Sequence, residues 1–186
     1  MQTIKAAVCR EFGQPLVIED ILIADPRMGE VEVTLDAVAI CHSDISYAEG
    51  AWGGHLPAVY GHEAAGKITK VGDGVNSFAT GDSVVVTLIR ACGTCPSCAG
   101  GKPTICETPY DGVKNGPIKT ADGSPLEQAM ACGAFAEKVV VDQRQIVKIP
   151  ETMGKEVAAL ISCGVITGVG AAVNAAGLRA GQDVVV

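Results

Sequence analysis

The stretch GHEAAGKITKVGDGV, which runs from Gly61 to Val75, combines a predicted β-strand, a turn and two reactive side chains. Lys67–Val71 has the β-branched character of a strand, and the GDG at Gly72–Gly74 predicts the turn that ends it. His62 and Glu63 stand between glycines just before this strand. A single histidine is more often a core or surface residue than a metal ligand, so its meaning depends on the rest of the chain.

Further strands are predicted on both sides of this stretch. In Glu30–Ala39, Val31, Val33 and Leu35 alternate with polar residues, which predicts a half-buried strand. The segment Thr108–Gly133 is rich in Gly, Pro and polar residues and receives no element. Many short strands separated by turns predict a β-barrel or β-sandwich over residues 1–150. The other predicted strands are Thr3–Cys9, Leu16–Ile23, Ser83–Leu88, Phe135–Val141 and Ile146–Ile149.

The amino-acid composition of the sequence changes after Pro150. Lys155–Ile161 and Val165–Ala176 are Ala-rich and helix-compatible, with close helix packing as the expected reason for Gly168 and Gly170. Asp183–Val186 has the composition of a further strand. We interpret residues 151–186 as a helical connector and the first strand of an absent domain, which makes the chain an incomplete protein.

The composition argues against several classes of protein to which this chain could belong. The chain has 186 residues and a formal net charge of −7, from 14 Lys+Arg and 21 Asp+Glu. This charge argues against a protein that binds nucleic-acid phosphates or anionic membranes. The N-terminus lacks the apolar core of a signal peptide, and no stretch is expected to be long and apolar enough to span a membrane. The cytoplasm is therefore the expected compartment, where thiols stay reduced.

Four of the eight cysteines fall in one loop, CGTCPSCAGGKPTIC, from Cys92 to Cys106. A disulfide knot, a metal site and unrelated thiols are the three possible explanations. The C-x2-C-x2-C-x7-C spacing and the expected reducing compartment favour zinc. Four thiolates complete a tetrahedral shell, so the site, over residues about 90–107, is predicted to be structural. A zinc ribbon that binds nucleic acid would bring basic surroundings, which this acidic chain does not show.

Two more short motifs contain possible ligands. Cys41-His42-Ser43-Asp44 follows the strand Glu30–Ala39, and Cys163 lies in SCGVITG between the two predicted helices. With the four-Cys loop and the G-H-E-x2-G-x5-G-x2-V pattern of Gly61–Val75, they resemble the zinc-containing medium-chain alcohol dehydrogenases. The order of the motifs is also the family's, and within it the class III, S-(hydroxymethyl)glutathione-dehydrogenase-like branch is the nearest resemblance.

The resemblance implies a fold, an activity and a cofactor. The expected fold is mainly β with some helix: a GroES-like β-barrel catalytic domain, followed by a Rossmann domain for NAD or NADP. The activity is reversible oxidation of an alcohol to an aldehyde or ketone, with hydride transfer to the nicotinamide. Zinc acts as a Lewis acid toward the alcohol oxygen. The chain ends before the dinucleotide glycine motif, so the isolated chain is expected to be inactive.

The resemblance also assigns the two zinc sites. It places the catalytic zinc on Cys41, His62 and Cys163, with Glu63 close behind the metal. It places the structural zinc on Cys92, Cys95, Cys98 and Cys106. Asp44 is expected to hydrogen-bond the ring of His62 and so to select its tautomer.

Four other residues receive roles on the same basis. Ser43 matches the hydroxyl that accepts the alcohol proton, and His42 the residue near the cofactor pyrophosphate. In some members the proton relay ends on a histidine at the position where this chain has Ser46. Beyond Ser43, the proton therefore has two possible routes, through His42 or directly to water. Trp52 is at a position that often lines the substrate pocket in the family, and the alternative is that it is a partly exposed aromatic residue of a loop. Thr167 touches the nicotinamide or caps a helix.

The implied partners are a small alcohol or aldehyde and, in the complete enzyme, further copies in a homo-oligomer. No nucleic acid and no membrane are expected. Two alternatives remain open. One is a zinc-stabilised GroES-like binding or scaffold module without catalysis. The other is a relative of the zinc-free quinone reductases, which lack the ligand cysteine and the four-Cys lobe.

Overall fold

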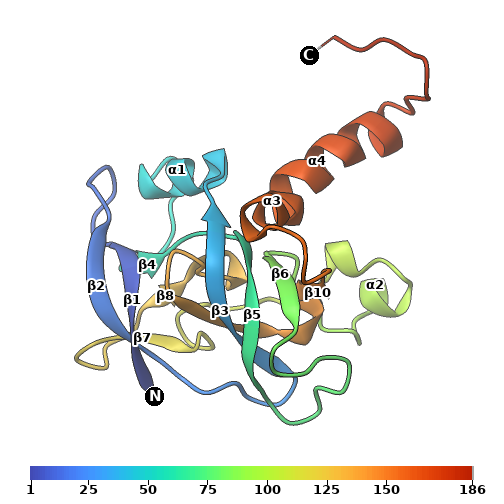
Figure 1. Cartoon of the computed structure of the whole chain (residues 1–186). Coiled ribbons are helices and arrows are strands. Elements are labelled where there is room, and N and C mark those ends of the chain that lie inside the picture. Colours follow the sequence, from blue (N-terminus) through green and yellow to red (C-terminus); the bar gives the residue numbers. More distant parts are fainter. Residues whose placement is uncertain (186) are drawn as a thin grey trace.

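Two five-stranded sheets form a barrel-like body, from which one helical segment projects (Figure 1). The structure is a computed structural model that describes residues 1–185. The first sheet has the strand order β7-β2-β1-β4-β8, and the second has the order β10-β6-β5-β3-β9. The strands are β1 Gln2–Cys9, β2 Val17–Ile23, β3 Glu30–Ala39, β4 Ala58–Val59, β5 Glu63–Val71, β6 Ser83–Thr87, β7 Ile118–Thr120, β8 Glu127–Gln128, β9 Lys138–Asp142 and β10 Ile146–Lys148.

The helices are short and lie mostly at the ends of strands. The α-helices are α1 His42–Ala48, α2 Pro96–Ala99, α3 Lys155–Leu160 and α4 Ile166–Val169. The remaining turns are the 3-10 elements η1 Pro103–Ile105, η2 Ala129–Ala131 and η3 Gln143–Gln145, and the π-helical elements η4 Ile161–Val165 and η5 Gly170–Ala175.

The predicted β-barrel is confirmed, and the strand Glu30–Ala39 has the predicted bounds. Two predicted strand starts are wrong by more than one residue. The strand β5 begins at Glu63 instead of Lys67, and β9 begins at Lys138 instead of Phe135. The segment Thr108–Gly133 also contributes the short strands β7 and β8, because its backbone pairs with β2 and β4. Strands this short carry no periodic signal, which explains why the sequence did not reveal them.

The strand β3 lies between β5 and β9, and its Val31 and Val33 side chains are buried in the main core cluster. The prediction that β3 is half-buried is wrong at Glu32, which is 1% exposed. Its carboxylate accepts a hydrogen bond of 2.7 Å from Thr69 and pairs with Lys138 at 3.1 Å and Lys70 at 3.4 Å. A buried carboxylate is tolerated here because these partners compensate its lost hydration.

Glu32 makes a pH-dependent contribution to the stability of the barrel. Burial raises the pKa of Glu32, but hydrogen bonds from Thr69 and Lys138 and the charges of Lys138 and Lys70 outweigh it, so the net pKa is lowered. A lowered folded-state pKa stabilises the fold above the unfolded value of about 4.3 and loses this effect as the pH falls.

We expect Glu32→Gln to lower the free energy of unfolding by about 1–3 kcal/mol at pH 7, because it leaves two lysines without their buried partner. The difference from wild type should shrink below about pH 4, where the wild-type carboxylate takes up its proton. Urea unfolding between pH 3 and pH 7 measures both values. A difference that stays constant over this range would contradict the ionised pair.

The C-terminal helical segment runs from Lys155 to Ala175 as α3, η4, α4 and η5 without an intervening loop. Ala158 and Ala159 of α3 pack on Ala65 and Val85 of the barrel, whereas the later turns point away from it (Figure 1). The expectation that no stretch is long and apolar enough to cross a membrane is wrong for this segment. It has 21 residues, of which only Lys155 and Glu156 are charged, and most of its length is exposed. Length and composition alone do not assign it to a membrane.

Two other expectations for this segment differ from the structure. A Cβ built on Gly168 or Gly170 meets nothing within 4 Å, so close packing within the described chain does not explain these glycines. Residues 183–185 form no strand, because no strand of the described chain lies beside them to pair with their backbone; Val186 of that predicted strand lies outside the described residues.

Candidate metal centres

Three separate elements bring four metal-binding side chains together. Cys41 follows β3 at the start of α1, His62 and Glu63 stand where β5 begins, and Cys163 lies in the π-helical turn η4. The ligand atoms of Cys41, His62, Glu63 and Cys163 all lie within 4.8 Å of one another. The structure therefore brings together the residues that the sequence predicted for the catalytic zinc, and it places a Glu63 oxygen among the possible ligands.

Asp44 connects the two barrel elements of this group. It is 2% exposed, and its carboxylate accepts hydrogen bonds of 3.0 Å from the backbone N–H groups of Cys41 and Gly61. Its Oδ1 also lies 3.1 Å from Nδ1 of His62. With Nδ1 engaged by the carboxylate, Nε2 remains free to bind a metal.

The charges in the group suit a cation. Burial, followed by the nearby charges of Glu63 and Cys41, raises the pKa of Cys163 to about 11. Burial lowers the pKa of His62, but the hydrogen bonds and charges of Asp44 and Cys41 outweigh this effect and raise it. Thiol and carboxyl groups repel one another as anions at this range, and a divalent cation between them removes that repulsion. The donor set therefore fits zinc.

The remaining predicted residues lie on α1, in the turn that follows α1, and on α4. Ser43 Oγ is 3.6 Å from Cys41 Sγ, and His42 is exposed beside it on α1. Thr167 lies one helical turn after Cys163, where its side chain lowers the pKa of that thiol, and it does not cap a helix. Trp52 is 59% exposed and packs edge-on against Tyr47, with 5.1 Å between ring centroids.

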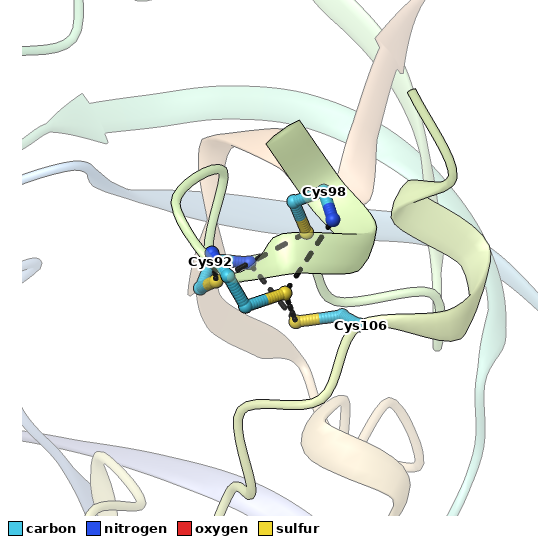
Figure 2. A group of neighbouring side chains, drawn as sticks. Cys92, Cys98 and Cys106 are labelled. Carbon is cyan, nitrogen blue, oxygen red and sulfur yellow. Dashed lines mark hydrogen bonds between the residues drawn. The ribbon is translucent and has the colours of Figure 1, made fainter. Parts of the chain in front are cut away.

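The four-Cys loop folds into a separate lobe, in which the labelled sulfurs point toward one another (Figure 2). The ligand atoms of Cys92, Cys95, Cys98 and Cys106 lie within 4.8 Å of one another. Cys92 Sγ is 4.0 Å from Cys98 Sγ, and Cys95 Sγ is 3.9 Å from Cys106 Sγ. These separations match the edges of a tetrahedron with Zn–S bonds of about 2.3 Å, and they are far longer than a disulfide bond. All eight cysteines of the described chain are free.

Backbone N–H groups favour the thiolate form of Cys92 and Cys106. A backbone hydrogen bond from Gly93 lowers the pKa of Cys98, but burial and the neighbouring thiols outweigh it and raise this pKa to about 11. Cys92 Sγ accepts from the N–H groups of Thr94 at 3.4 Å and Cys95 at 3.2 Å, and Cys106 Sγ accepts from the N–H of Cys92 at 3.3 Å. The Thr108 side chain and these N–H groups lower the pKa of Cys92 to about 5. Since thiolates are the form that binds zinc, the lobe also fits this metal.

Sequence reasoning missed the buried glutamines that hold the loop between β8 and β9. Gln128 donates to the carbonyls of Cys132 and Val140 at 3.0 and 2.9 Å, and Gln145 donates to those of Thr87 and Ala131 at 3.0 and 2.9 Å. They brace Met130 and Ala131, whose φ angles of 52° and 53° are unusual for residues with a side chain. Neither glutamine lies in a recognisable motif, so only the structure identifies them.

The fold and the clusters agree with comparisons to known proteins. Residues 27–151 match the family described as alcohol dehydrogenase GroES-like domain. Alcohol dehydrogenase B of Mycobacterium tuberculosis is 39% identical over 98% of this chain and 50% of that protein. Alcohol dehydrogenase class-3 of Drosophila melanogaster is 40% identical over 97% of this chain and 49% of that protein.

A solved structure gives the same result. The alcohol dehydrogenase zinc-binding domain protein from Burkholderia ambifaria superposes with a TM-score of 0.90, at 35% identity, over 98% of this chain and 51% of that one. The chain spans about half the length of the curated relatives it matches. The predicted GroES-like barrel is thus confirmed, and the chain belongs to the zinc-containing medium-chain alcohol dehydrogenase family.

Proposed function

We propose that the chain supplies the catalytic part of a zinc-dependent alcohol dehydrogenase. The reaction is the reversible oxidation of an alcohol to an aldehyde or ketone, with hydride transfer to NAD or NADP. The convergence of Cys41, His62, Glu63 and Cys163 within 4.8 Å carries this proposal, because three elements distant in sequence meet there. The alcohol dehydrogenases among its relatives support the activity.

The residues around the group have distinct roles in this proposal. Zinc held by Cys41, His62 and Cys163 would supply a Lewis acid that lowers the pKa of an alcohol's hydroxyl proton. Ser43, whose Oγ is 3.6 Å from Cys41 Sγ, accepts that proton. His42 is exposed on the same turn and passes the proton to water, whereas Ser46 is 8% exposed and offers no direct route to solvent. Asp44 holds the His62 ring in place.

The cofactor and substrate contacts extend the same proposal. His42 faces the cofactor pyrophosphate, Thr167 the nicotinamide, and Trp52 the substrate. Residues 1–150 form the catalytic domain, and residues 151–186 lead into a dinucleotide-binding domain, which agrees with the double length of the relatives. We therefore expect the isolated chain to show no NAD(P)-dependent turnover.

Three finer assignments belong to the proposal. The class III branch is supported by the match to the Drosophila melanogaster class-3 enzyme, although the Mycobacterium tuberculosis relative is almost equally identical. The complete enzyme is proposed to be a homo-oligomer. The cytoplasm is the proposed compartment, because the free thiols of the described chain need a reducing environment.

Counting zinc tests the proposal directly. Elemental analysis of chain purified without added metal should give about two zinc ions per chain, one for each cluster. Cys98→Ser should remove the lobe zinc, because three thiolates leave its shell open, and Cys163→Ala should remove the catalytic zinc. Each variant should therefore hold about one ion.

The matched control is Cys9→Ser, which changes a cysteine outside both clusters and should leave the zinc content unchanged. If the wild-type chain holds only one zinc ion and Cys98→Ser removes it, then the four-Cys lobe is the only cluster that binds zinc. That result would favour a zinc-stabilised scaffold over a dehydrogenase.

A further inference from the structure

The C-terminal helical segment leaves the barrel directly after Ser162. Its first helix, α3, packs on the barrel, and Ser162 is 3% exposed, whereas residues 164–169 are all exposed. Cys163, between these two parts, is half-buried. The proposed metal ligand of this segment therefore lies at the boundary between the part that the barrel holds and the part that projects from it.

The winding of the segment changes at the same place. The π-helical turn η4, Ile161–Val165, contains Cys163 and separates the α-helices α3 and α4. A π-helical turn closes its hydrogen bond one residue later than an α-helical turn does, and such turns are frequent at functional sites. Since an α-helix rotates by about 100° per residue, this one residue redirects the side chains around the turn. The direction of the Cys163 side chain thus depends on η4.

The hydroxyl of Ser162 fastens this turn to α3. Its Oγ donates to the backbone carbonyl of Ala159 at 2.6 Å, and this hydrogen bond is buried. A serine that bonds a carbonyl one turn earlier enters the ladder of helical hydrogen bonds and bends the helix. Ala159 is 1% exposed and packs on Ala65 and Val85, so the bond joins η4 to a fixed point on the barrel.

A second contact between η4 and the barrel is weaker. The backbone N–H of Gly164 donates to Glu63 Oε2, but the distance is 3.4 Å, at the long end for a hydrogen bond. Glu63 also belongs to the group whose ligand atoms lie within 4.8 Å of one another. The shorter and buried bond of Ser162 is therefore the stronger constraint on the turn that precedes the projecting helix.

We propose that Ser162 is a positioning residue for Cys163: its hydroxyl supports the π-helical turn that directs the sulfur toward Cys41 and His62. This inference rests on the proposed zinc at that centre. A role in helix stability alone predicts that Ser162→Ala is neutral or stabilising, because alanine is the better helix former. A positioning role predicts that the same variant binds zinc less tightly.

The test measures the affinity and the geometry of this centre in the whole chain. Competition with a chromogenic chelator gives the zinc affinity, and the visible absorption of bound cobalt(II), which takes the same nitrogen and sulfur ligands, reports the geometry. The ion that Cys163→Ala removes defines the centre, so the difference between the parent chain and Cys163→Ala separates it from the four-Cys lobe.

The variants are Ser162→Ala, Ser162→Thr and the matched control Ser83→Ala. Ser83 is also buried, at 4% exposed, but its Oγ has no hydrogen-bond partner among the described residues. The control therefore removes a buried serine hydroxyl that bonds nothing.

We expect Ser162→Ala to weaken zinc binding at this centre about tenfold, the lower end of the range for residues that orient a metal ligand, and to change the cobalt spectrum. Ser162→Thr should restore both, because a threonine hydroxyl reaches the same carbonyl in a helix. Ser83→Ala should leave both unchanged. Urea unfolding of the zinc-free chain should show no loss of stability in Ser162→Ala.

The outcomes separate this inference from the proposed function. A parent chain without a zinc ion that depends on Cys163 overturns the proposed centre, and this inference falls with it. A parent centre whose affinity and cobalt spectrum are unchanged in Ser162→Ala overturns the role of Ser162 alone. A loss that Ser162→Thr or Ser83→Ala shares in full also overturns it, because the bonded hydroxyl is then not the cause. Weaker zinc binding together with a less stable zinc-free chain overturns it too, since the bond then supports the fold.

Discussion

Asp44→Ala is expected to lower the free energy of unfolding by about 3–5 kcal/mol and zinc affinity at the Cys41–His62–Cys163 site by about 10–100-fold. The carboxylate is 2% exposed and accepts from the N–H groups of Cys41 and Gly61 and from the His62 ring. Its removal leaves these donors buried without partners, and the imidazole loses the contact that selects its tautomer. Urea unfolding and a zinc competition titration measure the two effects.

Two comparisons make the Asp44 result specific. Asp36→Ala changes an exposed carboxylate on β3 and should alter stability by no more than about 0.5 kcal/mol. Asp44→Asn keeps the shape but presents an amide N–H to one of the donors, so it should fall between wild type and Asp44→Ala. Wild-type zinc affinity in Asp44→Ala would show that Asp44 supports only the fold.

Gly66→Ala is expected to destabilise the barrel by about 3 kcal/mol, one of the largest effects for a single added methyl group. A Cβ on Gly66 would overlap the carbonyl oxygen of Thr34 and lie 2.9 Å from Leu35 Cα. Both atoms belong to the backbone of β3, which cannot move aside as a side chain can. The pairing of β3 with β5 already shifts register between Leu35 and Ala37, so the strands approach closely at this point.

Gly168→Ala is the matched control for this substitution. A Cβ there meets nothing within 4 Å, and Gly168 lies inside the helix α4. The same methyl group should therefore raise stability by about 0.5–1 kcal/mol, because alanine loses less conformational freedom in a helix. Thermal unfolding of both variants compares them directly, and equal losses would contradict the assigned close approach of β3 and β5.

The features that could be predicted from the sequence are those with a signal in a short stretch of chain. Alternating apolar residues predicted β3, and tight cysteine spacing predicted the lobe cluster, because both signals lie within about fifteen residues of chain. The meeting of Cys41, His62 and Cys163 came only from family resemblance, since no spacing rule relates positions so far apart. The structure adds the geometry that brings them together.

Other features had no local signal at all. Glu32 reads as the polar face of a strand, and its burial depends on Thr69 and Lys138, which are distant in sequence. In the sequence Arg90 is one of several scattered cations, and only the structure shows that it pairs with Asp142, at the end of β9, and stacks on Tyr110. Tertiary context of this kind overrides the two-residue period that the sequence displays.

The helical segment that projects from the barrel carries Cys163, whereas Cys41 and His62 belong to the barrel itself. An ion bound to all three acts as a cross-link between two parts of the chain, and the link closes a loop of about a hundred residues. The orientation of the segment and the occupancy of the ion are then thermodynamically reciprocal. Amide hydrogen exchange in Ile161–Val165 should therefore slow when the ion binds, which makes this turn a reporter of the centre without any substrate.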